Sequence, residues 1–138
     1  MRAEAAHWLQ SAGADREAAA LLLRARRFSH AAFMAHQAAE KALKAAVIAA
    51  TRDYPPLTHN LRVLAERTGA PQPEGLTTAL LRLGPHYTAS RYPDAAGGPP
   101  ELAYNAAIAR ELLAASDVAR EWAVAICKAP EPPEGGQR

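Results

Sequence analysis

Apolar residues recur along this chain at intervals of three and four, which is the spacing of amphipathic α-helices. The spacing is most regular near the end, where one apolar series continues for about six turns and predicts a long helix that ends near Lys128. A flexible joint at residues 97–100, which contain only glycine and proline, should precede this helix. The series consists of Tyr104, Ile108, Leu112, Ala115, Val118, Ala119, Trp122 and Ile126.

The beginning of the chain predicts two helices joined by a short link. One helix should cover about residues 3–26, and Ser29 is a suitable N-cap for the next, which should continue to about residue 50. Because the link is short, we expect these two helices to form an antiparallel hairpin.

Prolines and glycines divide the middle of the chain into shorter elements. Residues 54–56 include two consecutive prolines, and proline disfavours helical backbone at the residue before it. Thr58 is then a candidate N-cap for a short helix over about residues 59–67. A fourth helix should cover about residues 73–83, and an ordered turn should follow around residues 87–94.

The composition indicates an all-α protein. Alanine, the strongest helix former, makes up about a quarter of the residues, and no β-branched run typical of a strand occurs. The 138 residues fit one domain, which should span residues 1–128, while the polar residues 129–138 are expected to be disordered. Alanine helices bury little apolar area each, so we expect a second copy to cover an exposed face in a homodimer.

Charge and cysteine content narrow the class of function. The formal net charge of +2 is compatible with a phosphate-bearing partner, yet far below that of a dedicated nucleic-acid binder. The single Cys127 excludes an internal disulfide, which favours a cytoplasmic location. No leader-like segment and no apolar run of about 20 residues occurs, so no membrane association is expected. Neither an H-E-x-x-H pair nor a glycine-rich phosphate loop is present, so we predict no metal site and no cofactor.

Residues 36–45 are the most informative segment, because they predict a helix with a polar seam. Glu40 and Lys44 stand four residues apart in the favourable order, and His36 lies one turn before Glu40 on the same face. Gln37 and Lys41 form a second polar row beside the first. Alanines and one leucine supply the face that packs.

Two later segments, residues 56–61 (Pro-Leu-Thr-His-Asn-Leu) and 89–94 (Ala-Ser-Arg-Tyr-Pro-Asp), complete a pattern with this seam. From about Trp8 to Trp122 the chain resembles prokaryotic HEPN-domain proteins, small helical domains often encoded beside a minimal nucleotidyltransferase. The resemblance implies an all-α antiparallel four-helix bundle with one extra short helix, in the HEPN-like up-and-down topology, and a homodimer. It also implies a nucleotidyltransferase partner in a toxin–antitoxin-like pair, with nucleotide or RNA as the ligand.

Active HEPN ribonucleases carry an arginine followed by a histidine, with about four to six residues between them, near the start of a late helix. Arg91 lies in the comparable region, but no histidine follows it. His86 precedes it in the reverse order, and the two could meet across a turn or across a dimer. Arg91 and His86 are therefore the catalytic candidates for one alternative function, a divergent metal-independent ribonuclease.

A binding role suits Arg91 and its neighbours better than a catalytic one. A planar cation beside an aromatic ring, here Tyr92, suits a phosphate and a base, and Asp94 lies close by in the same segment. Further contacts to nucleotide or RNA could come from Lys41, Lys44 and His59.

The opposing interpretation is structural. In it, Arg91 pairs with a carboxylate such as Glu40 or Asp94, Tyr92 packs against the helices, and the protein is a dimeric scaffold without a ligand. We favour a non-catalytic nucleotide- or RNA-binding and interaction module, with the ribonuclease and the scaffold as alternatives.

Overall fold

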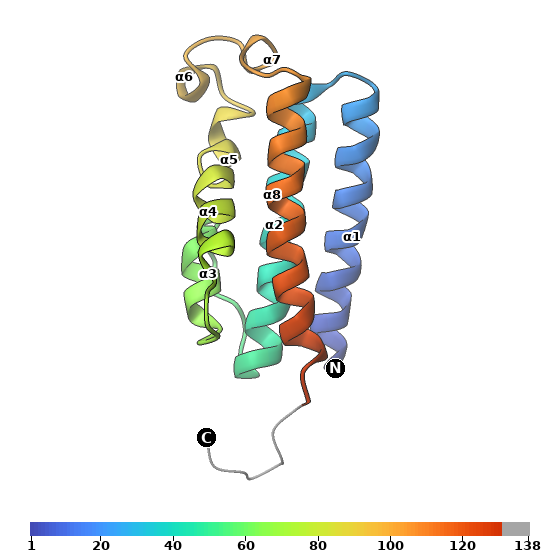
Figure 1. Ribbon diagram of the computed structural model, residues 1–138, viewed down its shortest axis with the longest axis vertical. Helices are drawn as coiled ribbons and strands as arrows, with labels where there is room; N and C mark the ends of the chain where they lie inside the picture. The colour runs from blue at the N-terminus through green and yellow to red at the C-terminus, as the bar shows by residue number, and fades with distance from the viewer. Residues whose placement is uncertain (131–138) are drawn as a thin grey trace.

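The computed structural model describes residues 1–130, and within them every regular element is helical (Figure 1). The predicted all-α class is therefore confirmed. The elements are α1 (Ala3–Arg24), α2 (Phe28–Thr51), α3 (Leu61–Arg67), α4 (Glu74–Leu83), α5 (His86–Ala89), α6 (Pro93–Ala96), α7 (Pro100–Ala103) and α8 (Ala106–Lys128).

The helices α1, α2, α4 and α8 run alternately up and down and pack as a bundle (Figure 1). Helix α2 is central, since it contacts α1, α8 and the short α3. Helix α4 completes the bundle by packing against α8. The structure thus has the predicted antiparallel four-helix arrangement with an additional short helix, including the hairpin of the first two helices.

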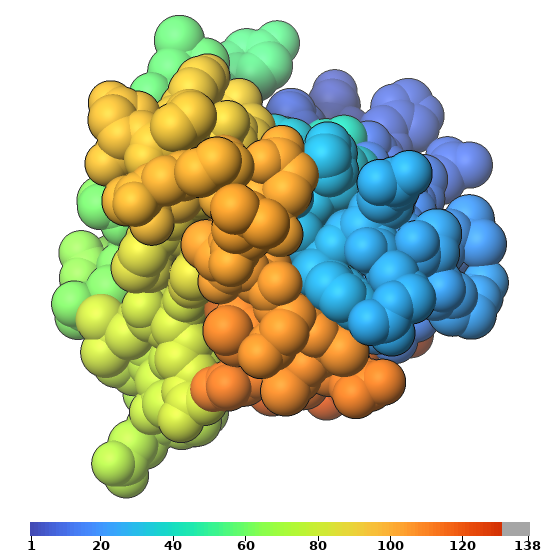
Figure 2. All heavy atoms as spheres, turned by 90° about the horizontal axis from the view of Figure 1, so that it is seen from above, coloured from blue at the N-terminus to red at the C-terminus, as the bar shows by residue number. Residues whose placement is uncertain are grey.

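Three four-residue helices connect α4 to α8, and two of them, α6 and α7, lie at one end of the bundle (Figure 1). Seen from above, α6 and α7 lie over this end, beside the link between α1 and α2 (Figure 2). The turn predicted around residues 87–94 therefore consists of α5 and the beginning of α6. In the predicted joint, Gly97 has a φ of 76° and Gly98 a φ of 152°, which side-chain-bearing residues rarely adopt.

Small side chains let the long helices approach one another closely. On α2, Ala35, Ala39 and Ala42 are completely buried in the core. A buried hydrogen bond from Oγ of Ser116 on α8 to the carbonyl oxygen of Ala35, at 2.6 Å, ties α8 to α2. Larger apolar side chains of the core include Leu43 and leucines of α3 and α4. These leucines are Leu61, Leu64, Leu76, Leu80 and Leu83.

The predicted N-cap of the second helix is wrong. Helix α2 begins at Phe28 with Arg27 as its N-cap, and Ser29 is buried inside the first turn. The carbonyl oxygen of Arg27 already accepts the N–H of Ala31 at 2.9 Å, so the helical hydrogen bonding starts before Ser29.

The predicted N-cap of the short third helix is also wrong, because Asn60 caps it rather than Thr58. Oδ1 of Asn60 accepts the N–H groups of Arg62 and Val63 at 3.0 and 3.2 Å. The hydroxyl oxygen of Thr58 instead accepts the N–H of Asn60 at 3.1 Å, which forms a turn before the helix. His59 consequently lies outside the helix, in this turn.

The last helix begins later than the apolar series suggests. Helix α8 starts at Ala106, and Oδ1 of its N-cap Asn105 accepts the N–H of Ile108 at 2.9 Å. Tyr104, the first member of the series, precedes the helix and is nevertheless buried in the core.

Residues 131–138, most of the tail predicted to be disordered, lie outside the described residues. Within residues 1–130, none of the helices has the length and apolar content that crossing a bilayer requires.

Candidate functional site

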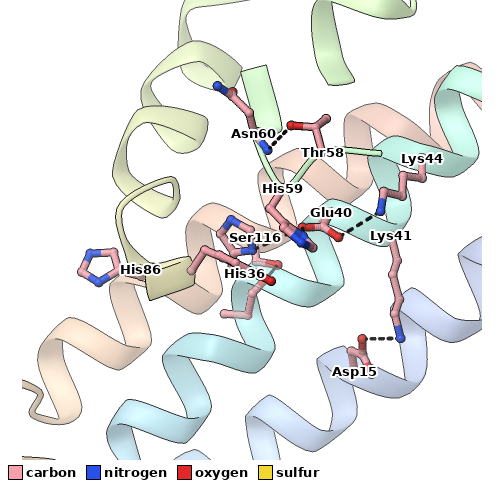
Figure 3. Close-up of polar contacts among 12 residues, drawn as sticks. Asp15, His36, Glu40, Lys41, Lys44, Thr58, His59, Asn60, His86 and Ser116 are labelled. Carbon is pink, nitrogen blue, oxygen red and sulfur yellow. Dashed lines mark hydrogen bonds and ion pairs between the residues drawn. The ribbon is translucent and has the colours of Figure 1, made fainter. Parts of the chain in front are cut away.

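Glu40, in the middle of α2, joins this helix to the turn before α3. Glu40 is only 3 % exposed, yet both of its carboxylate oxygens accept hydrogen bonds. Oε2 accepts a hydrogen bond from Nζ of Lys44 at 3.1 Å, one turn further along the same helix. Oε1 accepts a hydrogen bond from Nδ1 of His59 at 2.9 Å (Figure 3). The polar seam of α2 therefore holds the turn before α3 in place.

The bond to Glu40 determines how the ring of His59 presents its two nitrogens. A carboxylate oxygen only accepts, so Nδ1 of His59 carries the proton in this bond. In the neutral ring, Nε2 is then the nitrogen with the free lone pair. The side chain of His59 is 53 % exposed, so this nitrogen belongs to a surface residue.

Tyr87 on α5 connects His59 to Arg91. The rings of His59 and Tyr87 are stacked, with centroids 4.0 Å apart and an interplanar angle of 16°. Nε of Arg91 donates to the carbonyl oxygen of Tyr87 at 3.0 Å, and its guanidinium carbon lies 4.4 Å from the Tyr87 ring centroid. The same guanidinium lies over Phe33 at 4.6 Å and over Tyr92 at 4.8 Å. These contacts place a planar cation among aromatic rings.

A surface groove of about 420 Å³ borders the stacked rings. Residues 59–62 form part of the lining, and residues 80–81, 84–85 and 87–88 contribute the rest, including Tyr87. The lining combines apolar side chains such as Leu81 with the polar side chains of Asn60 and Arg62. A concave space of this size suits a ligand with the dimensions of a nucleotide.

His36 lies beneath the site and is completely buried. Its Nδ1 is 4.0 Å from Oε1 of Glu40, and neither ring nitrogen has a hydrogen-bond partner among residues 1–130. The centroid of its ring is 5.3 Å from that of Tyr87. Burial lowers the pKa of His36 to about 4, even though the nearby Glu40 favours the charged form. The ring is therefore neutral at neutral pH.

The low pKa of His36 should make folding sensitive to mild acid. Its pKa is about 4 in the folded state against 6.5 when unperturbed, so between these values the unfolded chain binds a proton that the folded chain does not. The free energy of unfolding should fall by about 1 kcal/mol from about pH 7 to about pH 5.5 on account of this residue. Urea titrations of the wild type and of His36→Leu at both pH values measure it. Equal losses in the two proteins would contradict the assignment.

The structure brings some of the predicted binding residues together and separates others. Arg91 and Tyr92 are in contact, and His59 joins them through Tyr87. Asp94 is exposed on α6. The alternative in which Arg91 pairs with Glu40 or Asp94 is not what the structure shows, because the partners of Arg91 within residues 1–130 are aromatic rings and a backbone carbonyl.

The two lysines of α2 have partners within the fold. Nζ of Lys44 contacts Glu40 and lies 5.4 Å from the ring centroid of Trp8. Nζ of Lys41 points to α1, where it is 2.8 Å from Oδ2 of Asp15 and also donates to a serine hydroxyl (Figure 3). Lys41 thus lies away from the groove, and Lys44 reaches the site only through Glu40.

His86, the candidate catalytic partner of Arg91, is hydrogen-bonded to a different residue. Nδ1 of His86 is 2.6 Å from the hydroxyl oxygen of Tyr104, which links α5 to the residue before the N-cap of α8. Burial lowers the pKa of His86 and raises that of Tyr104. Among the described residues, His86 and Arg91 therefore form no paired acid–base arrangement.

Two features of the site were missed by sequence reasoning. Tyr87 precedes Arg91 by four residues, a spacing that a helical turn at this position would have revealed. The hydrogen bond between His59 and Glu40 joins residues that lie nineteen positions apart on different elements. No local sequence pattern predicts it.

Metal binding and thiol chemistry find less support in the described part of the chain. No three histidine, cysteine, aspartate or glutamate side chains within residues 1–130 gather as a metal site would need. Burial raises the pKa of the Cys127 thiol to about 11, so it is protonated at neutral pH and unsuited to act as a nucleophile.

Comparisons with known proteins agree with this architecture. The family model described as the HEPN domain matches residues 5–125. The fold is similar to the crystal structure of TT1696 from Thermus thermophilus, with 30 % sequence identity over 91 % of this chain and 99 % of that chain, at a TM-score of 0.81. It is also similar to the crystal structure of ST0689, an archaeal HEPN homologue, with 25 % identity over 93 % and 100 % of the two chains and a TM-score of 0.78. No curated protein matches the chain.

Proposed function

Because the chain belongs to the HEPN domain family, whose members are generally associated with nucleotides and RNA, we propose that it is a non-catalytic module that binds nucleotide or RNA. The proposed binding surface consists of His59, Tyr87, Arg91 and Tyr92, called here the stacked surface. The observation that carries the proposal is the position of Arg91 among aromatic rings, one of which, Tyr87, lines the groove.

The chemistry of the stacked surface suits the two parts of a nucleotide. An arginine guanidinium is planar and donates to phosphate oxygens, and exposed aromatic rings stack on bases of any sequence. Nε of Arg91 donates to the carbonyl oxygen of Tyr87, which orients the guanidinium. Its two terminal nitrogens are the donors that would contact a ligand. Tyr92 is half-exposed, so one ring remains accessible for stacking.

We also propose that the protein acts as a homodimer and as the partner of a minimal nucleotidyltransferase in a toxin–antitoxin-like pair. Support for this comes from the family membership and from the apolar side chains left on the surface of the single chain. Examples that are more than half exposed are Tyr54, Leu57, Leu81 and Leu102.

A divergent ribonuclease is the second candidate, and the pair formed by Glu40 and His59 favours it. A histidine whose Nδ1 is held by a carboxylate can accept a proton at Nε2, which is what a general base for a ribose hydroxyl requires. The groove beside His59 would then hold the substrate.

Replacing Arg91 by alanine should weaken RNA binding about tenfold or more, because a stacked cationic contact contributes roughly 1–3 kcal/mol. We would measure retention of a labelled single-stranded RNA and of adenine nucleotides by the pure protein, with a chelator and at fixed salt. Arg24→Ala is the matched control, since it removes the same charge at the exposed end of α1, on the far side of α2 from α5 (Figure 1). Arg91→Lys, which keeps the charge without the planar group, should be intermediate.

The other outcomes separate the candidate functions. Equal weakening by Arg91→Ala and Arg24→Ala would show nonspecific attraction to charge and contradict the proposed surface. Cleavage of the RNA that His59→Gln abolishes would establish the ribonuclease instead. If neither RNA nor nucleotide binds, the scaffold and its protein partner are the function to pursue.

A further inference from the structure

We propose that Nε2 of His59 is a phosphoryl acceptor, a surface nucleophile that takes a phosphoryl group from an activated donor with a labile N–P or acyl-phosphate bond. The modification does not depend on nucleotide or RNA binding, although it uses one residue of the stacked surface. Three features of the structure support it: the orientation of the ring, the carboxylate behind it, and the space and charge in front of it.

The contacts of the ring fix the direction of the reactive nitrogen. Nδ1 is held 2.9 Å from Oε1 of the buried Glu40, and one face of the ring lies against Tyr87. The two nitrogens of an imidazole point in divergent directions, so Nε2 is directed away from Glu40, on a side chain that is 53 % exposed. Two independent contacts therefore select one ring orientation and one tautomer before any donor arrives.

The carboxylate of Glu40 suits the charge that the reaction creates. The lone pair of Nε2 attacks phosphorus, an N–P bond forms, and the bond between phosphorus and the leaving group breaks with its electron pair on that group. With phosphoramidate in its zwitterionic form, the leaving group is ammonia, and no further proton is needed. The phosphorylated ring keeps its Nδ1 proton and becomes positive, directly opposite Glu40. Lys44 holds the other carboxylate oxygen and fixes its position.

The groove provides room and a cation for the incoming group. His59 forms part of the wall of the 420 Å³ groove, which Arg62 also lines. The exposed guanidinium of Arg62 is a suitable partner for phosphoryl oxygens. A small donor can therefore approach His59 from the solvent side without displacing a core residue.

The other histidines lack this combination. His36 is completely buried, and His86 is hydrogen-bonded through Nδ1 to Tyr104. His7 and His30 are exposed, but among the described residues neither has a carboxylate partner. His7 and His30 are therefore internal controls, because they are exposed like His59 but, within residues 1–130, lack a carboxylate partner at the ring.

The test is the rate at which each histidine is phosphorylated when the full-length protein is incubated with phosphoramidate. Acid-labile, base-stable phosphate at each position would be quantified by mass spectrometry at early times. We expect His59 to react about tenfold or more faster than His7 and His30 in the same molecules. His59→Gln should remove the fast phase and leave the slow sites unchanged. Because all three sites compete within one folded protein, this comparison does not depend on the stability of any variant.

The role of Glu40 as a positioning residue has its own readout. Glu40→Gln should lower the rate at His59 toward that of His7, whereas Glu40→Asp, which retains the negative charge, should recover part of it. Reaction at His59 no faster than at His7 and His30 in the wild type would overturn the proposal. Because RNA retention is measured without a phosphoryl donor, failure here would leave the proposed binding function intact, and failure of RNA binding would leave this proposal intact.

Discussion

Glu40→Ala should reduce the free energy of unfolding by about 4 kcal/mol, a large fraction of the stability of a small domain. The carboxylate is almost completely buried and is the partner of both Lys44 and His59. Its removal leaves a mostly buried ammonium without its counter-charge and releases the turn before α3, so the loss exceeds that of a surface ion pair. Urea denaturation followed by circular dichroism gives the difference from the midpoint and the slope.

A matched control comes from the ion pair between Arg16 and Asp117, which links α1 to α8 with both side chains about one-third exposed. Asp117→Ala should cost no more than about 1 kcal/mol, because solvent screens such pairs. If Glu40→Ala were no more destabilising than Asp117→Ala, the carboxylate would not be the structural centre that its burial indicates.

Leu43→Ala should destabilise the protein by about 3 kcal/mol. Leu43 is completely buried in the middle of α2, where most neighbouring core positions on the same helix are alanines. Short side chains of this kind cannot extend into the space that the lost isobutyl group leaves, so a cavity should persist between α2 and its neighbours. Urea denaturation measures the loss, and the unchanged helical signal in the folded baseline shows that the architecture is retained.

Leu21→Ala provides the comparison for this core substitution. Leu21 lies on a helix of similar length, α1, but is 57 % exposed. The same chemical change there should alter the free energy of unfolding by less than about 0.5 kcal/mol. Similar losses at the two positions would mean that helix propensity, and not burial, controls the effect of removing leucine from this bundle.

The long helices could be predicted from the sequence because their signal is local. The three-four spacing of apolar residues and the high alanine content determine helix formation over each segment, and short links require neighbouring helices to be antiparallel. The predicted ends were less accurate where several capping residues stand close together. Thr58 and Asn60 are both good caps, and the hydrogen bond that the Thr58 hydroxyl accepts from the N–H of Asn60 decides between them.

Part of the candidate site was also visible along the chain. Arg91 and Tyr92 are adjacent, so their combination of planar cation and aromatic ring could be recognised without a structure. The role of Lys41 could not be predicted in this way, because its ammonium group contacts Asp15 on α1. Which residues of two helices face each other is known only after the helices pack. The same holds for Phe33, which meets Arg91 across the contact between α2 and the end of α5.

The sequence by itself determined that this protein is a helical bundle, since periodicity, propensity and breakers all act within a few residues of one another. The HEPN family was identified separately, from the resemblance of three polar segments, and the family model over residues 5–125 confirms it. Only the tertiary structure decided what the polar seam of α2 does. Burial makes Glu40 depend on partners, and the packing of the turn before α3 against α2 supplies one of them in His59. Distant residues meet through the burial of apolar surface over the whole bundle, so the tautomer of His59 and its stacking on Tyr87 are properties of the fold and not of any segment.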